Sequence, residues 1–322
     1  MHRIHTLRKR TTMKITNLIT ATMAMISTAF AAWQPEEVPD DIRRNYLDAN
    51  MVMSEDPCDW RETVRAIFAP AVEHCNSPRE AVLYIAENMT KLTGAYYTIE
   101  RRRADMNALE ALAEKKISCS GQTILMVCAY RSIGIPARAV GIPTWNHIRG
   151  NHSWPEVYFD GEWHMIEFNE KDFNTGWVME NIGMLDPKHP LQKILAVHPG
   201  GEYCFPVYQD RPIPAIDVTE RYRKLSADWY AKYGPPADQQ RLMVDVVPRP
   251  EVAPNIELLD ENGKVLGIKP LPVKTDDVRF FATFSMPREG KHYLRIEGSQ
   301  QQLEVPTTPD AVQVLHLQMG KK

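Results

Sequence analysis

The sequence places a cysteine at the expected start of an apolar helix. The run from Cys119 to Tyr130 reads CSGQTILMVCAY and is apolar around its whole circumference from Ile124 onward, which predicts a buried helix. At a helix N-terminus the dipole and the free backbone N–H groups stabilise a thiolate and lower the pKa of the thiol. Cys119 is therefore a candidate nucleophile, whereas Cys128 lies in mid-helix and is expected to fill the core.

A base and an acid for this thiol lie on a predicted β-hairpin. Ser153–Phe159 and Glu162–Phe168 alternate like strands, and Asp160-Gly161 between them is a strong two-residue turn signal. With that turn, paired residues on the two strands have numbers that sum to 321. Four side chains then share one face of the sheet: His152, Trp154, Glu167 and Asn169.

His152 and Glu167 are diagonal neighbours in this register, about 7–8 Å apart at the backbone, a gap that long side chains bridge. A nucleophile needs a base, and the base needs an orienting acceptor, so Cys119, His152 and Glu167 offer the three parts of a catalytic triad. The alternative is a structural histidine beside a solvated strand charge. Apolar residues flank Glu167, however, and a buried carboxylate there requires a partner.

Three motifs, in this order, resemble those of the transglutaminase-like superfamily. Asp105–Pro136 resembles its short helix, cysteine start and long apolar helix, and Ala137-Arg138 completes the GIPAR exit. Asn151–Tyr158, which reads NHSWPEVY, resembles the histidine motif. Trp163–Glu167, which reads WHMIE, resembles the Trp-x-x-hydrophobic-Asp motif.

The resemblance implies an α+β chain with a papain-like, transglutaminase-core cysteine proteinase fold. It assigns Cys119 as the nucleophile, His152 as the base and Glu167 as the orienting acid. The sequence departs from the family at Ile117, where glycine is usual, and at Glu167, where aspartate is usual. The group that orients His152 is therefore either Glu167 or Asn169, since an amide does this in papain-like enzymes.

The chemistry implied by the resemblance is acyl transfer. A Cys119 thiolate attacks an amide carbonyl, His152 protonates the leaving amine, and water or a second amine resolves the thioester. Backbone N–H groups at the helix start, including that of Cys119, are expected to hold the oxyanion. Other candidates are weaker: Tyr96, Tyr97 and Gln122 as further oxyanion donors, His147 as an alternative base in a surface loop, and His164 as a structural residue.

The rest of the chain divides into a helical start, a hairpin region and a strand-rich end. Apolar spacing predicts four helices before the cysteine: Asp41–Met53, Glu62–Val72, Pro78–Leu92 and Asp105–Glu114. Residues 170–215 are irregular and Pro-rich, either a functional loop or an insertion with its own helix. The expected domains are a catalytic domain at 33–236 with N-terminal helices and a small C-terminal β-sandwich at 240–320.

Composition excludes several classes of protein. The 322 residues are 43% hydrophobic and 25% charged, which is typical of a globular chain. There is no paired CxxC for zinc, no glycine-rich phosphate loop and no calcium loop, so neither a metal nor an organic cofactor is expected. Among the five cysteines, Cys58 and Cys75 form either a disulfide or two unpaired thiols, and Cys204 has no evident partner.

The first 31 residues resemble an export signal. They carry five of the 38 basic residues and no acidic one, and an uncharged run, Ile15–Phe30, leads to Ala29-Phe30-Ala31, an A-x-A cleavage site. The alternative is a membrane anchor, which normally needs about 18 apolar residues. Cleavage leaves 33 basic against 41 acidic residues, a balance that disfavours nucleic acid and an anionic membrane as partners. No later segment is expected to span a membrane, so stable membrane insertion after cleavage is not expected. The mature protein is expected in the periplasm or the medium.

Three functions remain open from the sequence. The favoured one is an exported cysteine hydrolase that acts on amide bonds of a peptide or protein substrate. The second is a protein-cross-linking transglutaminase, and the third is a catalytically silent binding module whose C-terminal domain does the work. The sequence leaves the substrate and the oligomeric state open.

Overall fold

The computed structural model describes residues 38–148, 150–186, 188–205, 213–276 and 280–318, and the predicted signal at residues 1–31 lies outside them. The chain divides into two compact units. The first comprises the described residues up to Ile142, His152–Thr175 and Ile194–Val218; the second comprises Pro143–Asn151, Gly176–Lys193 and the described residues from Thr219 onward. The domain bounds 33–236 and 240–320 stay a prediction.

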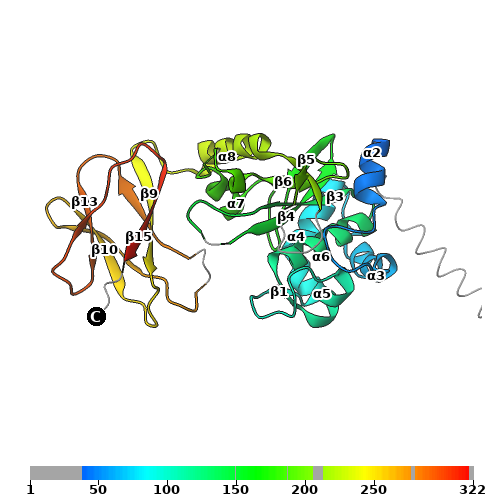
Figure 1. The fold of residues 1–322 in the computed structure, drawn as a ribbon, viewed down its shortest axis with the longest axis horizontal. Helices are drawn as coiled ribbons and strands as arrows, with labels where there is room; N and C mark the ends of the chain where they lie inside the picture. The colour runs from blue at the N-terminus through cyan, green and yellow to red at the C-terminus, as the bar shows by residue number, and fades with distance from the viewer. Residues whose placement is uncertain (1–37, 149, 187, 206–212, 277–279, 319–322) are drawn as a thin grey trace, which may run out of the picture. The chain divides into compact units, whose positions relative to one another are not determined.

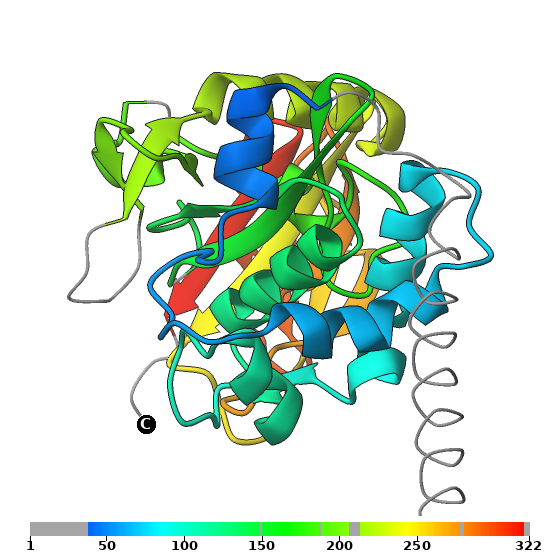
Figure 2. The same cartoon turned by 90° about the vertical axis from the view of Figure 1, so that its right-hand side faces the viewer.

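Most helices of the first unit gather on one side of a sheet (Figures 1 and 2). The helices of this unit are α2 (Asp40–Ile42), the π-helix η2 (Arg43–Leu47), α3 (Arg61–Ala71), α4 (Pro78–Thr93), α5 (Ala108–Glu114) and α6 (Cys119–Ser132). Local chemistry sets several of their starts. At α4, for example, the Ser77 hydroxyl accepts the Glu80 N–H at 3.2 Å and Pro78 takes the first helical position.

The sheet of the first unit has six strands in the order β5-β4-β3-β6-β8-β7, and each neighbouring pair is antiparallel. The strands are β3 (Ala137–Ile142), β4 (His152–Phe159), β5 (Glu162–Met165), β6 (Leu195–Val197), β7 (Tyr203–Cys204) and β8 (Pro214–Asp217). Phe159 pairs with Glu162 across the Asp160-Gly161 turn, both of whose residues have positive φ. The predicted hairpin register is therefore confirmed.

Helix α6 forms the centre of the first unit. It packs against β3 and β4 on one side and contacts α3, α4 and α5. Every residue from Thr123 to Ser132 is buried, as the all-round apolar pattern predicts. A small parallel pair of strands, β1 (Tyr96–Tyr97) and β2 (Lys116–Ile117), lies directly before its first residue.

A buried arginine near the end of α6 fixes the segment that follows η2. Arg131 donates from Nη1 to the carbonyl oxygens of Ala49 and Met51 at 2.9 and 2.8 Å, and from Nε and Nη2 to that of Ala137. The first two carbonyls point at the guanidinium and are not available for helical hydrogen bonds. The predicted helix Asp41–Met53 therefore ends early, with η2.

The second unit contains two short helical segments, a longer helix and two sheets. The helical segments are α7 (Gly176–Ile182) and the 3-10 helix η3 (Pro190–Gln192), and the longer helix is α8 (Thr219–Tyr233). One sheet has the order β11-β10-β13-β14 and the other β12-β9-β15; Figure 1 labels β10 and β13 of the first and β9 and β15 of the second. The strands are β9 (Gln239–Val247), β10 (Asn255–Asp260), β11 (Val265–Pro270), β12 (Ala282–Pro287), β13 (His292–Ile296), β14 (Leu303–Glu304) and β15 (Val312–Gln318).

Both sheets of the second unit contribute to one hydrophobic core. Leu242 and Val244 of β9 and Phe284 of β12 are buried in the same cluster as Ile256 of β10 and Leu294 of β13. The alternating burial along β12 is typical of a strand with one face on a core.

The predicted irregular segment 170–215 is only partly irregular. It contains α7, η3, β6 and β7 and the start of β8, so an insertion with its own helix is the correct alternative. Each of these elements is seven residues or shorter, too short to give a periodic pattern. In the described part of the chain, no helix combines the length and apolar character needed to cross a bilayer.

We expect Arg131→Met to lower the free energy of unfolding by about 3 kcal/mol, because it removes the hydrogen bonds of a buried guanidinium to the Ala49, Met51 and Ala137 oxygens. Chemical denaturation followed by circular dichroism measures the change. Arg43→Met, at an exposed position of η2, is the control and should change stability by less than about 0.5 kcal/mol. Equal effects of the two substitutions would contradict this role of Arg131.

Candidate active site

Cys119 is the first residue of α6, as its sequence position predicts. The helix is capped by Ser118, whose hydroxyl oxygen accepts the Gly121 N–H at 3.1 Å. The thiol lies against His152 and accepts hydrogen bonds from the backbone N–H groups of Ser120 and Ser153. The sulfur therefore meets donors from two elements, the first turn of α6 and the start of β4.

His152 is the first residue of β4 and contacts a carboxylate. Its Nε2 atom lies 2.5 Å from Oε1 of Glu167, and the two residues are only 9% and 8% exposed. Because Glu167 occupies Nε2, Nδ1 is the ring nitrogen that remains for the thiol of Cys119. The structure thus brings Cys119, His152 and Glu167 together, with the base between the nucleophile and the acid.

Electrostatics favour the charged forms of the thiol and the imidazole. Burial raises the pKa of Cys119, but the hydrogen bond and charge of His152, with the two backbone donors, outweigh it and lower that pKa below its ordinary value. Burial lowers the pKa of His152, yet the Glu167 charge and the contacts with Cys119 and Glu167 raise it to about 9. Both shifts therefore favour the thiolate and the imidazolium over the neutral thiol and imidazole.

Trp154 and Asn169, the other two residues expected on this face, have different roles. The Trp154 ring is buried and lies 5.7 Å from the His152 ring, centre to centre, which restricts the imidazole. The Asn169 amide instead hydrogen-bonds the Thr90 hydroxyl at 3.3 Å. Asn169 as the group that orients His152 is therefore wrong.

The reason is that β5 ends before the register reaches Asn169. The last paired residue of β5 is Met165. Asn169 has a φ of 64° and donates its backbone N–H to the Ala86 oxygen of α4. The chain has turned toward that helix, so the period-2 argument no longer holds at this position.

The remaining candidates are placed elsewhere. His164 stacks on Phe159 at 4.1 Å between ring centres, in agreement with a structural role. His147 belongs to the second unit. Tyr96 and Tyr97 are exposed on β1, and Gln122 is half-buried one turn after Cys119.

The five cysteines are all free. A disulfide between Cys58 and Cys75 is not formed; the Cys75 thiol lies 3.8 Å from the His74 imidazole instead. Burial raises the pKa of Cys128 well above its ordinary value, which makes this thiol unreactive. Among the described residues, no group of three or more histidine, cysteine, aspartate or glutamate side chains is arranged to hold a metal ion.

A buried ion pair and a buried carboxylate near the site were not assigned a role from the sequence. Arg138 and Glu156 face each other across β3 and β4 and form an ion pair at 2.8 Å that is almost fully buried. The Arg138 guanidinium also lies 4.0 Å from the centre of the Trp163 ring. Arg138 and Glu156 both belong to the motifs that carry the resemblance. Their position in these motifs was the signal available in the sequence.

The second group is Asp105, the first residue of the cysteine-containing motif. It is buried, accepts a hydrogen bond from the Ser54 hydroxyl at 2.6 Å and interacts with the hydroxyl of Ser120. Ser120 is the residue whose N–H reaches the Cys119 sulfur. Asp105 therefore supports the first turn of α6.

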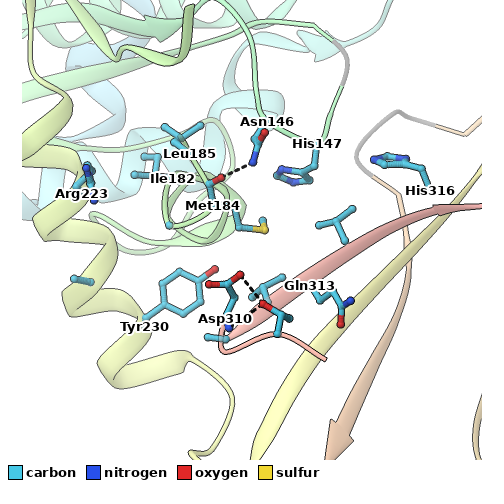
Figure 3. A pocket seen from close by; sticks show the side chains of 16 residues that line it. Asn146, His147, Ile182, Met184, Leu185, Arg223, Tyr230, Asp310, Gln313 and His316 are labelled. Atoms are coloured by element: carbon cyan, nitrogen blue, oxygen red, sulfur yellow. Dashed lines mark hydrogen bonds between the residues drawn. The ribbon is translucent and has the colours of Figure 1, made fainter. Parts of the chain in front are cut away.

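The second unit contains a separate cavity of about 850 Å³ (Figure 3). Its lining includes Asn146, His147, Arg223, Asp310 and Gln313. Both ring nitrogens of His147 and Oε1 of Gln313 are buried without a hydrogen-bond partner of good geometry among the described residues. Burial lowers the pKa of His147 to about 4, so this ring is neutral at physiological pH.

Solved structures similar to this chain include two described as transglutaminases. A red sea bream transglutaminase is 11% identical with a TM-score of 0.38, and the match covers 84% of this chain and 64% of that one. A protein described as a TGase is 19% identical with a TM-score of 0.23, over 33% and 30% of the two chains.

Another, from Cytophaga hutchinsonii and proposed to be a cysteine protease, is 15% identical with a TM-score of 0.30, over 34% and 38% of the chains. This chain spans less than two thirds of each of the three proteins. No curated protein sequence matches it. The model of the transglutaminase-like superfamily matches residues 65–168. That segment, which includes Cys119, His152 and Glu167, therefore carries the core of the transglutaminase-like superfamily, and the resemblance of the motifs is confirmed.

Proposed function

We propose that this protein is an exported cysteine enzyme that hydrolyses amide bonds of peptides or proteins through a thioester on Cys119. The observation that carries the proposal is the buried His152 ring, held by Glu167 on one nitrogen and adjacent to the thiol of Cys119. A cysteine, a histidine and a polar group that orients the histidine also form the triad of papain-like proteases. Export rests on the signal-like residues 1–31.

The reaction follows from the protonation states. The Cys119 thiolate attacks the amide carbonyl, and the C=O electrons move to the oxygen, where the N–H groups at the α6 N-terminus stabilise the charge. The oxyanion collapses, the C–N bond breaks and His152 gives its proton to the leaving amine. His152, now neutral, takes a proton from water, whose oxygen attacks the thioester. The C–S bond breaks, releasing the carboxylic acid and restoring the thiolate.

Hydrolysis is favoured over cross-linking because water is abundant outside the cell and no second substrate is evident in the sequence. In a cross-linking enzyme, a primary amine would take the place of water in the second step. The two reactions share the thioester and differ only in the group that resolves it.

A binding function is the second candidate, and the cavity of the second unit favours it. We infer that the two C-terminal sheets form a β-sandwich over their common core. The unpartnered His147 and Gln313 atoms in the cavity of that unit are suited to hydrogen-bond a polar ligand. Binding of this kind would survive Cys119→Ala, whereas hydrolysis would not.

Cys119 should react with iodoacetamide at pH 6 at least about 100-fold faster in the wild type than in His152→Ala, because the imidazolium stabilises the thiolate. Peptide mapping by mass spectrometry measures the label at each cysteine. Exposed Cys204 serves as the internal reference and should label at the same slow rate in both proteins. Equal rates at Cys119 in the two proteins would contradict the proposal.

Glu167→Gln should lower the pKa of His152 from about 9 toward 6.5, because the substitution removes the buried negative charge. A pKa of His152 that is higher in the folded than in the unfolded protein stabilises the fold. This stabilisation is complete below pH 6.5 and is lost as the pH rises through 9, so the His152–Glu167 pair should stabilise the fold at neutral pH. NMR titration of the His152 ring measures the shift. Glu162→Gln, at an exposed position of the same hairpin, is the control and should leave the midpoint unchanged. An unchanged midpoint in Glu167→Gln as well would refute the pairing.

Incubation of peptide amides with the enzyme should yield the carboxylic acid as the main product, even with an added primary amine. Mass spectrometry distinguishes the acid from the amine adduct, and Cys119→Ala controls for uncatalysed reaction. A dominant adduct would show that the enzyme is a cross-linking transglutaminase.

A further inference from the structure

The start of α6 is held by a segment that precedes it by about twenty residues. We name residues 96–105 the rim. The Thr98 N–H donates to the Ile117 oxygen at 2.9 Å, and the Ser118 hydroxyl donates to the Ala104 oxygen at 2.6 Å. The two attachments lie on either side of the rim's middle and end at the residues that directly precede Cys119.

The ladder of β1 and β2 attaches the start of the rim to the residues before the nucleophile. These strands run parallel, with Tyr96 opposite Lys116 and Tyr97 opposite Ile117, where both strands end. The Thr98 N–H then bonds the oxygen of Ile117, two residues before Cys119, and Ile99 is the next residue of the rim. β1 also packs against α6 itself. The rim therefore flanks the start of the helix that carries the thiol.

The rim exposes large apolar side chains at this place. Tyr96, Tyr97 and Ile99 are 45%, 41% and 76% exposed. Large exposed apolar side chains of this kind can bind a ligand, because their burial releases free energy in proportion to the area covered. Next to a nucleophile, the ligand that covers them is the substrate.

The rim also carries a cation that no carboxylate of the described residues pairs with. Arg101 donates from Nη1 to the Ile99 oxygen at 2.9 Å. The next two arginines, in contrast, form ion pairs at 2.8 Å or less with carboxylates of Asp56, Glu110 and Glu114. Arg101 is thus placed to bind a carboxylate of the ligand.

We propose that the rim is the acyl-donor subsite, which selects peptides with a large apolar side chain at the scissile carbonyl and a neighbouring carboxylate. This rests on the proposed function. His152 must protonate the leaving amine, so that half of the substrate lies over the hairpin. The acyl half extends to the other neighbours of Cys119, which are β2 and the rim. Ile99 contacts the apolar side chain and Arg101 binds the carboxylate.

Peptidyl chloromethyl ketones test this subsite without turnover. The Cys119 sulfur bonds to the methylene carbon and chloride leaves, so the rate reports recognition of the acyl half alone. We expect a ketone with leucine at the reactive carbonyl and aspartate before it to react about tenfold faster than two analogues. One analogue has serine in place of the leucine, and the other has lysine in place of the aspartate. Iodoacetamide, which has no peptide, measures the thiolate alone.

Ile99→Ser should reduce the leucine preference to about twofold, and Arg101→Gln should do the same for the aspartate preference. Ile268→Ser, at a 48% exposed isoleucine of β11 in the second unit, is the matched control and should retain both. Iodoacetamide rates should agree within about twofold in all four proteins, which shows that the site is folded.

Fast labelling by iodoacetamide without any preference among the ketones would overturn the rim proposal alone. Preferences that persist in Ile99→Ser and Arg101→Gln would overturn it as well. Slow labelling of wild-type Cys119 by every reagent would overturn the proposed function, and the rim proposal with it.

Discussion

The contact between His152 and Glu167 is the constraint on which the candidate site depends. A carboxylate that is 8% exposed is costly unless a donor or a cation meets it, and the imidazole does so at 2.5 Å. The same contact fixes the ring and raises the pKa of His152, which in turn lowers that of Cys119. The lowered pKa of the thiol therefore depends on a buried anion on the hairpin as well as on the helix that carries the sulfur.

Other buried charges fix the positions of α6 and of the hairpin relative to their neighbours. The Arg138–Glu156 pair joins β3 to β4, so that the position of His152 is fixed relative to the strand next to α6. Arg131 attaches the end of α6 to the loop before α3, and Asp105 supports its first turn through Ser120. Each is costly to bury alone, so each specifies one arrangement of its neighbours.

Local signals in the sequence were sufficient for the parts of the site that depend on local chemistry. The turn at Asp160-Gly161 sets the hairpin register, and the all-round apolar pattern sets α6. The predictions were wrong where residues that are distant in the sequence determine the local structure. The helix expected at Asp41–Met53 ends early because Arg131 binds its carbonyls, and Asn169 leaves the sheet because its backbone N–H bonds Ala86. Neither contact leaves a periodic pattern in the sequence.

The contact between Glu167 and His152 is made two residues beyond the end of the hairpin ladder. The ladder ends at Met165, and the next backbone contact, from the Ile166 N–H to the Pro155 oxygen, is long at 3.3 Å. The backbone at Glu167 is therefore not held by the ladder, and the contact depends on its side chain. Oε1 reaches Nε2 of His152 from this position, so the longer acid that stands where the similar family has aspartate still meets the imidazole.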